Sequence, residues 1–295
     1  MKNSTRYLFI VNPAAGRGRT KRLLPYIEFL IKELDIPYDI RLTSAPGEAT
    51  DIAKRGIAEG FEFIVAVGGD GTTHEVVNGI IDSPATLGVI STGGGNDFPK
   101  AANIPLDVPR AVETLKKGRI RKLDVGLFAE QYFVNGLGIG LDGEVSHRYK
   151  RMKYLRGELG YLWGAINAAL GFRGFETEII TQEWSYSGRV LLAGASNGPF
   201  QGGNFKLAPQ ARVDDGLLDI HIVQEMPRIK RLINMPKVRH GKHLHLKGVH
   251  IRQSTWIEIR TEESLPAHMD GEPFYLQPGK HKIEVLPGKL RVITS

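Results

Sequence analysis

Short apolar runs alternate with segments of helical periodicity through the first 100 residues of the chain. Runs of apolar and β-branched residues are typical of strands buried on both faces, and apolar residues recurring three or four positions apart are typical of helices. The alternation therefore predicts an α/β domain built on a parallel sheet. We expect strands at 7–11, 37–42, 63–67 and 86–90, with helices at about 20–34, at 49–59 and directly after the third strand.

The pattern changes from about Asp124 onward. Short strand-like runs are separated there by turns rich in glycine, proline and aspartate, which is typical of a β-dominated domain. One segment near 143–172 reads instead as a helical insertion. We therefore expect two domains, at 1–126 and 127–295, and leave open which of them receives the final strand-like run at 290–294. The strands expected in the second domain are 131–134, 177–181, 189–195, 217–223, 250–253, 256–260 and 282–285.

Loops rich in glycine or threonine follow the strands of the first domain, at the edge where open α/β sheets bind ligands. The most informative loop is Gly68-Gly69-Asp70-Gly71-Thr72. Glycine allows the backbone to approach a bulky anion, and the N–H groups of the following helix start point at that anion. A carboxylate there would repel a nucleotide unless it binds a metal ion or its water shell, as Mg-ATP provides. A tight turn without a ligand is the alternative, and the spacing matches neither a P-loop nor a dinucleotide fingerprint.

The composition narrows the class of protein. The chain has 295 residues, enough for two cores, and no cysteine, so it can form neither disulfides nor thiolate metal sites. It contains no run approaching the ~18 apolar residues of a membrane-spanning helix, and its start lacks a signal-peptide pattern. We therefore expect a cytoplasmic protein.

The net charge of +7 is unevenly distributed. Residues 145–157 and 226–257 hold many lysines and arginines and no acidic residue. Such runs attract nucleic acid or an anionic membrane, or they form a solvated face. Aromatic residues that would stack on bases are sparse in 226–252, which argues against a nucleic-acid partner. The cations of the first run are Arg148, Lys150, Arg151, Lys153 and Arg156.

Five motifs follow one another along nearly the whole chain. In this order they resemble the landmarks of the bacterial diacylglycerol kinase family of lipid kinases. The resemblance implies a Rossmann-like α/β nucleotide domain at the N-terminus and a β-sandwich-like domain at the C-terminus. It also implies transfer of the γ-phosphoryl group of ATP, with Mg²⁺, to a lipid hydroxyl. The motifs are Asn12-Pro13-Ala14-Ala15-Gly16, Gly68-Gly69-Asp70-Gly71-Thr72, Gly93-Gly94-Gly95-Asn96-Asp97-Phe98, Asp214-Asp215-Gly216-Leu217-Leu218 and Asp270-Gly271-Glu272-Pro273.

The resemblance assigns roles to single residues. It makes Glu272 the general base and Asp270 its acidic neighbour, although residues 270–272 read alone as a turn. We count Asp70 with these catalytic residues, because its position among the glycines already indicated that it handles the metal of the nucleotide. One departure is Gly94, which stands where the family commonly has a threonine that contacts the nucleotide. The nucleotide contacts implied by the resemblance are Asn12, Pro13, Ala14, Ala15, Gly16, Thr43, Gly68, Gly69, Asp70, Gly71, Thr72, Thr73, His74, Gly94, Asn96 and Asp97.

The resemblance also implies a structural Mg²⁺ site, formed by the Asp215 side chain and the backbone carbonyls of Arg212 and Leu217. Read alone, this segment is a turn that enters a strand. We interpret the glycine-rich run 136–143 as a close-packed turn. The histidines between 240 and 250 alternate with lysines as on an exposed strand, so we do not expect a metal site there.

These observations favour an ATP- and Mg-dependent lipid kinase that acts on a diacylglycerol-like hydroxyl. We expect it to be peripheral on the inner membrane face, bound to anionic lipid through the first basic run, with no nucleic-acid partner. Whether it forms a homodimer is left open. A kinase for a soluble hydroxyl, similar to NAD kinase, and a non-enzymatic nucleotide-binding protein are the alternatives.

Overall fold

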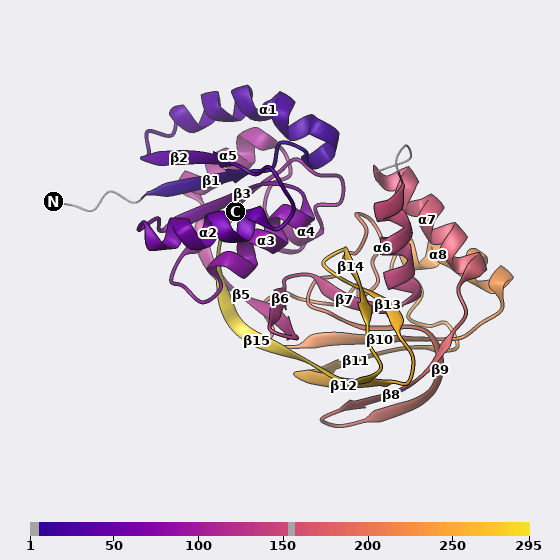
Figure 1. The fold of residues 1–295 in the computed structure, drawn as a ribbon. Coiled ribbons are helices and arrows are strands. Elements are labelled where there is room, and N and C mark those ends of the chain that lie inside the picture. The colour runs from indigo at the N-terminus through magenta and orange to yellow at the C-terminus, as the bar shows by residue number, and fades with distance from the viewer. Residues whose placement is uncertain (1–5, 153–156) are drawn as a thin grey trace. The chain divides into compact units, whose positions relative to one another are not determined.

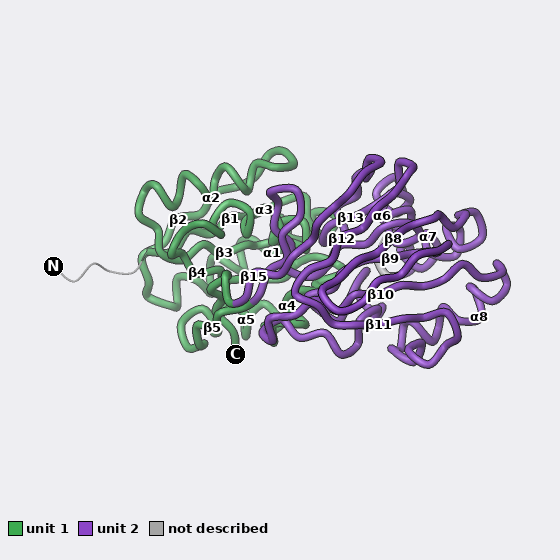
Figure 2. The backbone as a smooth tube through the Cα atoms, turned by 90° about the horizontal axis from the view of Figure 1, so that it is seen from below, with its two compact units in different colours: residues 1–123, 288–295 green, residues 124–287 purple. Residues whose placement is uncertain are grey.

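A computed structural model describes residues 6–152 and 157–295 of the chain (Figure 1). The chain forms two compact units (Figure 2). Unit 1 comprises the described residues up to Leu123 together with Gly288–Ser295, and unit 2 comprises Asp124–Pro287 apart from the undescribed 153–156. Lys153 and Arg156 of the first basic run therefore lie outside the described residues.

Unit 1 is built on a parallel sheet with the strand order β2-β1-β3-β4-β15. Each of β1 and β4 is buried along its whole length, because helices cover both faces of the sheet. Between β1 and β3 the order of the strands reverses, which is the point where open α/β sheets bind ligands. The strands are β1 Tyr7–Val11, β2 Tyr38–Leu42, β3 Phe63–Gly68, β4 Thr86–Ser91 and the end of β15 Gly279–Thr294.

Two pairs of helices cover this sheet. Ile27 and Ile31 of α1 and Val112 of α5 pack in one core with Phe9 of β1. On the opposite face α2 contacts Leu8, and α2 and α3 lie side by side (Figure 1). The helices are α1 Ala15–Lys32, α2 Glu48–Ala58, α3 Asp70–Ile80, α4 Asp97–Ala101 and α5 Val108–Lys117.

Unit 2 is an antiparallel β structure. Strand β9 is the centre of its pairing, because it pairs with β8 along its first half and with both β7 and β10 along its second half. The remaining pairs extend the sheet on either side of β9, over a core that includes Phe133, Phe175 and Ile257. The strands are β5 Arg119–Phe128, β6 Gln131–Phe133, β7 Gly136–Gly140, β8 Phe175–Thr181, β9 Ser185–Ser196, β10 Leu218–Gln224, β11 Val249–Ser254, β12 Trp256–Thr261, β13 Leu265–Met269, β14 Glu272–Leu276 and the first part of β15.

Three helices belong to unit 2: α6 Leu141–Arg151, α7 Gly157–Gly171 and α8 Arg228–Arg239. The first two occupy the segment in which we expected a helical insertion. The third, α8, was not expected. No helix in the described part of the chain has the length and apolar character needed to cross a membrane.

Two interpretations from the sequence are wrong. Residues 136–143 are not a turn but strand β7 and the start of α6. The histidines between 240 and 250 do not share an exposed strand, because His240 ends α8 and His243 is buried with its Nε2 3.0 Å from the carbonyl oxygen of Leu207. The α/β and β-sandwich-like fold class itself is confirmed.

Candidate functional site

The predicted nucleotide-binding residues of unit 1 gather at the carboxyl edge of its parallel sheet. The register pairs Val11 with Leu42 and with Val67, so the loops that follow β1, β2 and β3 begin side by side. The pairing of Gly68 with Ser91 adds the loop after β4. The residues that the resemblance implied as nucleotide contacts lie in these four loops, at the end of β3 or at the starts of α1, α3 and α4.

Asp70 connects two of these loops. Its Oδ2 accepts a hydrogen bond from the backbone N–H of Asn96 and its Oδ1 accepts one from the N–H of Asp97, each at 2.7 Å. Hydrogen bonds to a charged acceptor are about twice as strong as neutral ones. The carboxylate therefore fixes the path of the loop after β4 relative to the start of α3.

The glycines of the two loops allow this close approach. A Cβ atom on Gly93 would lie 2.6 Å from the Cα of Gly69, and one on Gly95 would lie 2.5 Å from the Asp70 carboxylate. Real Cβ atoms do not come that close to their neighbours. The glycines therefore serve the packing of one loop on the other, whether or not a phosphate also contacts them.

The loop after β1 is tied to the same place. Asn12 donates from Nδ2 to the hydroxyl of Thr72 at 3.1 Å, and its Oδ1 accepts the backbone N–H of Ala14 at 3.0 Å. The backbone then turns through three successive residues with positive φ, at Gly16, Arg17 and Gly18, before α1 continues as a regular helix. Asn12 thus links the first loop to the loop that contains Asp70.

The family commonly has a threonine at the position of Gly94. Thr92, two residues earlier, does not substitute for it. Its side chain is completely buried, and its hydroxyl lies 2.6 Å from the hydroxyl of Thr20 in α1. Nearby, the buried Oδ1 of Asn96 and the buried Oγ of Ser91 have no hydrogen-bond partner among the described residues. Buried polar atoms normally have partners, so these two atoms indicate that a ligand or its water shell completes the site. This polar, glycine-lined edge fits a nucleotide with its metal ion.

In unit 2, Asp270 and Gly271 form the turn between β13 and β14, and Glu272 is the first residue of β14. Asp270 and Gly271 both have positive φ, as the commonest two-residue hairpin turns require. Both oxygens of Asp270 accept backbone N–H groups, from Val134, Asn135 and Gly136. These hydrogen bonds hold Asp270 against the start of β7. The side chain of Glu272 is about half exposed, and its Oε2 lies 2.7 Å from Nζ of Lys150.

A buried pair that the sequence analysis missed lies next to this turn. His268 of β13 accepts the backbone N–H of Gly271 at its Nδ1, 3.2 Å away, and its Nε2 lies 3.0 Å from Oδ2 of Asp142. Burial alone would raise the pKa of the Asp142 carboxyl, but His268 and His221 together hold that pKa below its usual value. Gly138 makes the arrangement possible, because a Cβ there would collide with both side chains.

His221 of β10 belongs to the same buried cluster. Burial lowers the pKa of its imidazole to about 4, although the nearby Asp142 carboxylate opposes the shift and His268 and His243 reinforce it. The neutral form is therefore the native one near neutral pH. The signal that could have found the cluster is an aspartate beside a glycine-rich strand and a histidine two residues before the Asp-Gly-Glu motif.

The predicted Mg²⁺ site of unit 2 is a turn in which Asp215 accepts the backbone N–H of Leu217 at 3.1 Å. Burial raises the pKa of Asp215, and the carboxylates of Asp124 and Asp214 add to that shift. Asp124, another residue that the sequence analysis missed, accepts the N–H of Gly216 at 2.7 Å. Concentrated negative charge of this kind fits a hard cation. Neither here nor elsewhere do the described residues contain a group of three or more His, Cys, Asp or Glu side chains arranged to hold a metal, so a cation at this turn would also need backbone carbonyls as ligands.

Comparisons with known proteins support the landmarks. The diacylglycerol kinase catalytic domain matches residues 6–128, and the YegS C-terminal NAD kinase beta sandwich-like domain matches residues 136–294. A diacylglycerol kinase of Bacillus subtilis (strain 168) is 30% identical over 275 residues, 92% of this chain and 91% of that protein. The chain belongs to the diacylglycerol kinase family. It is therefore a phosphotransferase with an alcohol group as acceptor, and the resemblance seen in the sequence is confirmed.

Further relatives agree with this family. A Pseudomonas aeruginosa (strain UCBPP-PA14) protein named "Probable lipid kinase YegS-like" is 32% identical over 257 residues, 86% of this chain and 83% of that protein. A crystal structure of a diacylglycerol kinase from Bacillus anthracis str. Sterne has a TM-score of 0.75 at 24% identity, covering 100% of this chain and 98% of that one, and shows the fold alone. Another structure from that organism has a TM-score of 0.82 at 26% identity, covering 100% and 99%. A non-enzymatic nucleotide-binding protein is not compatible with this family.

The buried histidine predicts a pH dependence of the stability of this family member. His221 takes up a proton in the unfolded chain at its ordinary pKa of about 6.5 but only at about 4 in the native state. The unfolded state therefore binds more protons between these values, and the free energy of unfolding falls as the pH drops through that window. Between pH 7 and pH 5, we expect the free energy of unfolding of the wild type to fall by about 2 kcal/mol more than that of His221→Gln.

Urea denaturation followed by tryptophan fluorescence at the two pH values measures this difference. All three tryptophans lie in unit 2, at 163, 184 and 256, so the signal reports the unit that contains His221. The exposed His245 provides the control variant His245→Gln, which should follow the wild type. If the free energies of unfolding of the wild type and of His221→Gln depend equally on pH, the lowered pKa of His221 is contradicted.

Proposed function

We propose that the chain is an ATP- and Mg²⁺-dependent lipid kinase that phosphorylates a diacylglycerol-like hydroxyl at a membrane surface. The observation that carries the proposal is the gathering of the loops after β1, β3 and β4 around Asp70, in a chain of the diacylglycerol kinase family. Phosphoryl transfer depends mainly on positioning and on electrostatic stabilisation, and a rigid, glycine-lined edge with a fixed carboxylate supplies both.

In this proposal unit 1 binds the phosphoryl donor. The loop amides and the Asn12 side chain contact the phosphates, and Asp70 with the orphan oxygen of Asn96 holds Mg²⁺ or its water shell. The metal ion, when bound, neutralises the charge that develops on the transferred phosphoryl group. Asp70 has a second task, since the same carboxylate orders the loop that contains Asn96 and Asp97.

The proposed general base is Glu272. Its side chain is 47% exposed, at a turn whose neighbour Asp270 is fixed by three backbone N–H groups, so the carboxylate can reach a substrate while its backbone stays in place. A base must come within hydrogen-bond reach of the hydroxyl whose proton it accepts. Lys150 of α6 contacts the carboxylate and orients it, although an exposed ion pair of this kind contributes no more than about 1 kcal/mol to stability.

We also propose that the turn around Asp215 holds a structural Mg²⁺. The side chain of Asp215 and the carbonyls of Arg212 and Leu217 would be its ligands. The neighbouring carboxylate of Asp124 supports this proposal, because it adds negative charge beside the site and fixes the backbone at Gly216.

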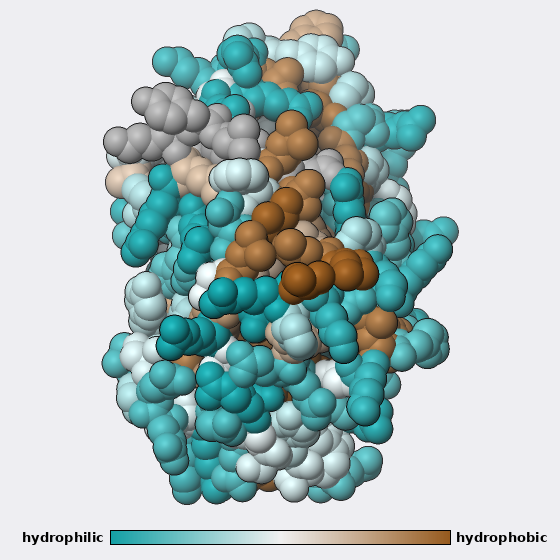
Figure 3. Space-filling model, turned by 90° about the vertical axis from the view of Figure 1, so that its right-hand side faces the viewer, coloured by the Kyte–Doolittle hydropathy of each residue, from teal (hydrophilic) through white to brown (hydrophobic). Residues whose placement is uncertain are grey.

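The proposed contact with the membrane is the outer face of α7 and α8, which is apolar (Figure 3). Leu159, Trp163 and Leu170 of α7 are 70%, 54% and 41% exposed. Ile229 and Ile233, one turn apart on α8, are 73% and 62% exposed. Scattered apolar side chains are ordinary on a protein surface, but a contiguous patch marks an interaction site. Tryptophan among aliphatic residues is typical of the membrane interface.

The charges around this patch favour an anionic bilayer. Arg228, Lys230 and Lys237 of α8 are exposed, and no acidic residue occurs in the run 226–257. The first basic run contributes less than its sequence suggests, because Arg148 bonds Glu144 at 2.6 Å and Lys150 pairs with Glu272. We therefore shift the proposed lipid contact from that run to the α7–α8 face.

Replacing the base tests the catalytic part of the proposal. A positioned general base accelerates a reaction by about 10²- to 10⁴-fold. We expect Glu272→Gln to lower kcat at least 100-fold for radiolabelled phosphate transfer from Mg-ATP to diacylglycerol in mixed micelles, with an unchanged Kd for ATP. Glu262→Gln, at an exposed acid on the same unit, should retain activity. Wild-type turnover by Glu272→Gln would refute the assignment of the base, and activity only on soluble alcohols would refute the lipid acceptor.

The membrane contact has its own test, in a double variant of α8. Burying one aliphatic side chain stabilises by about 1.5–3 kcal/mol, so Ile229→Ser with Ile233→Ser should weaken sedimentation with phosphatidylglycerol vesicles by at least tenfold. The matched control is Tyr26→Ser with Phe29→Ser, because these side chains are comparably exposed on α1, at 46% and 58%. If both double variants sediment like the wild type, the α7–α8 face is not the membrane contact.

A further inference from the structure

Beneath α7 and α8 lies a cavity of about 120 Å³. Its lining comes from one face of each helix, from α6 and from the sheet strands β9 and β10. Tyr161, Ala165 and Ala169 follow one another at helical spacing on α7, and Met235 and Val238 face them from α8. These residues differ from the exposed ones on the same helices. Both helices therefore carry apolar side chains on their inner and their outer faces, with exposed cations beside the outer ones on α8.

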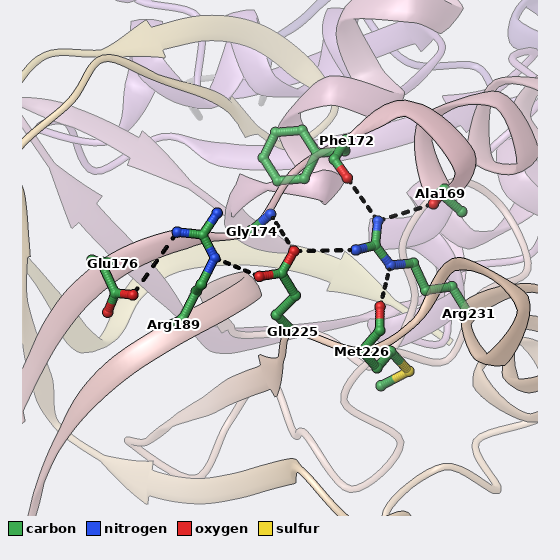
Figure 4. A network of polar contacts seen from close by, with 8 residues as sticks. All are labelled: Ala169, Phe172, Gly174, Glu176, Arg189, Glu225, Met226 and Arg231. Atoms are coloured by element: carbon green, nitrogen blue, oxygen red, sulfur yellow. Dashed lines mark hydrogen bonds and ion pairs between the residues drawn. The ribbon is translucent and has the colours of Figure 1, made fainter.

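The polar groups that line the cavity are mostly engaged. The guanidinium of Arg231 donates to the carbonyl oxygens of Ala169, Phe172 and Met226, at 3.0, 2.7 and 2.8 Å, and pairs with Glu225 (Figure 4). Glu225 also accepts the N–H of Gly174. This network ties the end of α7 to the start of α8 and gives the guanidinium of Arg231 partners within the protein.

Two further polar residues line the cavity, and each has one side-chain atom without a hydrogen-bond partner among the described residues. Oε1 of Gln201 and Nδ1 of His243 are buried and accept no hydrogen bond from the described residues. The Nε2 of His243 donates to a carbonyl, so its Nδ1 is an acceptor. A water molecule or a ligand hydroxyl would supply the missing donors. Apart from Asp142 and Asn234 the rest of the lining is apolar. An apolar protein cavity of about 150 Å³ is known to bind benzene.

The cavity reaches the candidate catalytic turn through one residue. Asp142 lines the cavity and contacts His268, which accepts the backbone N–H of Gly271. Gly271 immediately precedes Glu272. A ligand with its chain in the cavity would therefore have its polar end on the side of the proposed base.

We propose that this cavity binds a hydrocarbon chain of the lipid acceptor and that its lining on α6, α7 and α8 selects the chain. The inference rests on the proposed function and extends it from the hydroxyl to the rest of the substrate. The apolar outer face of the same two helices supports it, because a chain that leaves a bilayer there would pass from one apolar surface to another. Each methylene buried in this way strengthens binding by about fourfold.

Filling the cavity tests the proposal. Ala165 is 7% exposed on the inner face of α7, and Ala165→Phe puts a ring into the space. We expect kcat/KM for dioleoylglycerol to fall at least tenfold, kcat/KM for dibutyrylglycerol to change less than twofold, and the KM for ATP to stay the same. Ala58→Phe is the matched control, because it makes the same substitution at an exposed position at the end of α2 and should leave the ratio of the two substrates at the wild-type value.

A second variant at the same cavity keeps the proposal testable if Ala165→Phe does not fold. Val145→Ala enlarges the same cavity from α6, and we expect it to raise the preference for dioleoylglycerol over dibutyrylglycerol. If Ala165→Phe and Val145→Ala both fold, as judged by circular dichroism, and both keep the wild-type ratio, the cavity does not select the chain.

A binding measurement without ATP separates this inference from the proposed function. Equilibrium dialysis of tritiated monooctanoylglycerol, below its micellar concentration, should give saturable binding to the wild type and at least tenfold weaker binding to Ala165→Phe. Equal binding to both proteins overturns the inference even when the wild type phosphorylates lipids. Binding that is lost in Ala165→Phe supports the cavity even when no lipid is phosphorylated, in which case only the proposed function fails.

Discussion

The carboxylate of Asp70 is the constraint on which the site in unit 1 depends. It accepts two backbone N–H groups from the loop after β4, and the glycines of both loops are small enough to allow that approach. Asp70 is partly buried, and a carboxylate that loses part of its water needs hydrogen-bond donors in exchange. The amides of Asn96 and Asp97 are such partners. One side chain thus orders the loop after β4, and in the proposed function the same carboxylate also handles the metal.

Unit 2 is organised by a comparable device around the Asp-Gly-Glu turn. Helix α6 contacts the turn from both of its ends: Asp142 in its first turn contacts His268, and Lys150 in its last turn contacts Glu272. Asp270 is held by the start of β7. The proposed base Glu272 is therefore partly exposed, whereas the neighbouring pair Asp142 and His268 is buried. The same helix lines the apolar cavity, so the support for the chemistry and the proposed chain-binding space share one element.

Much of the fold follows from local signals in the sequence. Strands β1 and β3 of unit 1 are apolar runs without a charged residue, and the five motifs that carried the family resemblance lie at strand ends or turns. Strand β7 was missed because glycine is disfavoured in strands, yet Gly138 is needed there to make room for Asp142 and His268. Helix α8 was missed because Arg231, interpreted as part of a basic surface, is buried in a polar network.

Contacts between distant segments were beyond the reach of the sequence patterns. Glu75 of α3 is one example, because its carboxylate accepts the N–H groups of Gly47 and Ala49 at the start of α2. The pairs Asp142–His268 and Asp124–Gly216 likewise join residues about a hundred positions apart. Local periodicity carries no information about such pairs. It therefore indicated which loops could bind a ligand but not what holds those loops in place.

Isothermal titration calorimetry with ATP, in the presence and absence of Mg²⁺, tests most directly the claim that Asp70 handles the metal of a bound nucleotide. The account predicts Mg²⁺-dependent binding to the wild type and at least tenfold weaker binding to Asp70→Asn, with Asp51→Asn on α2 behaving like the wild type. Binding of ATP that is equally tight without Mg²⁺, or unaffected by Asp70→Asn, would contradict it.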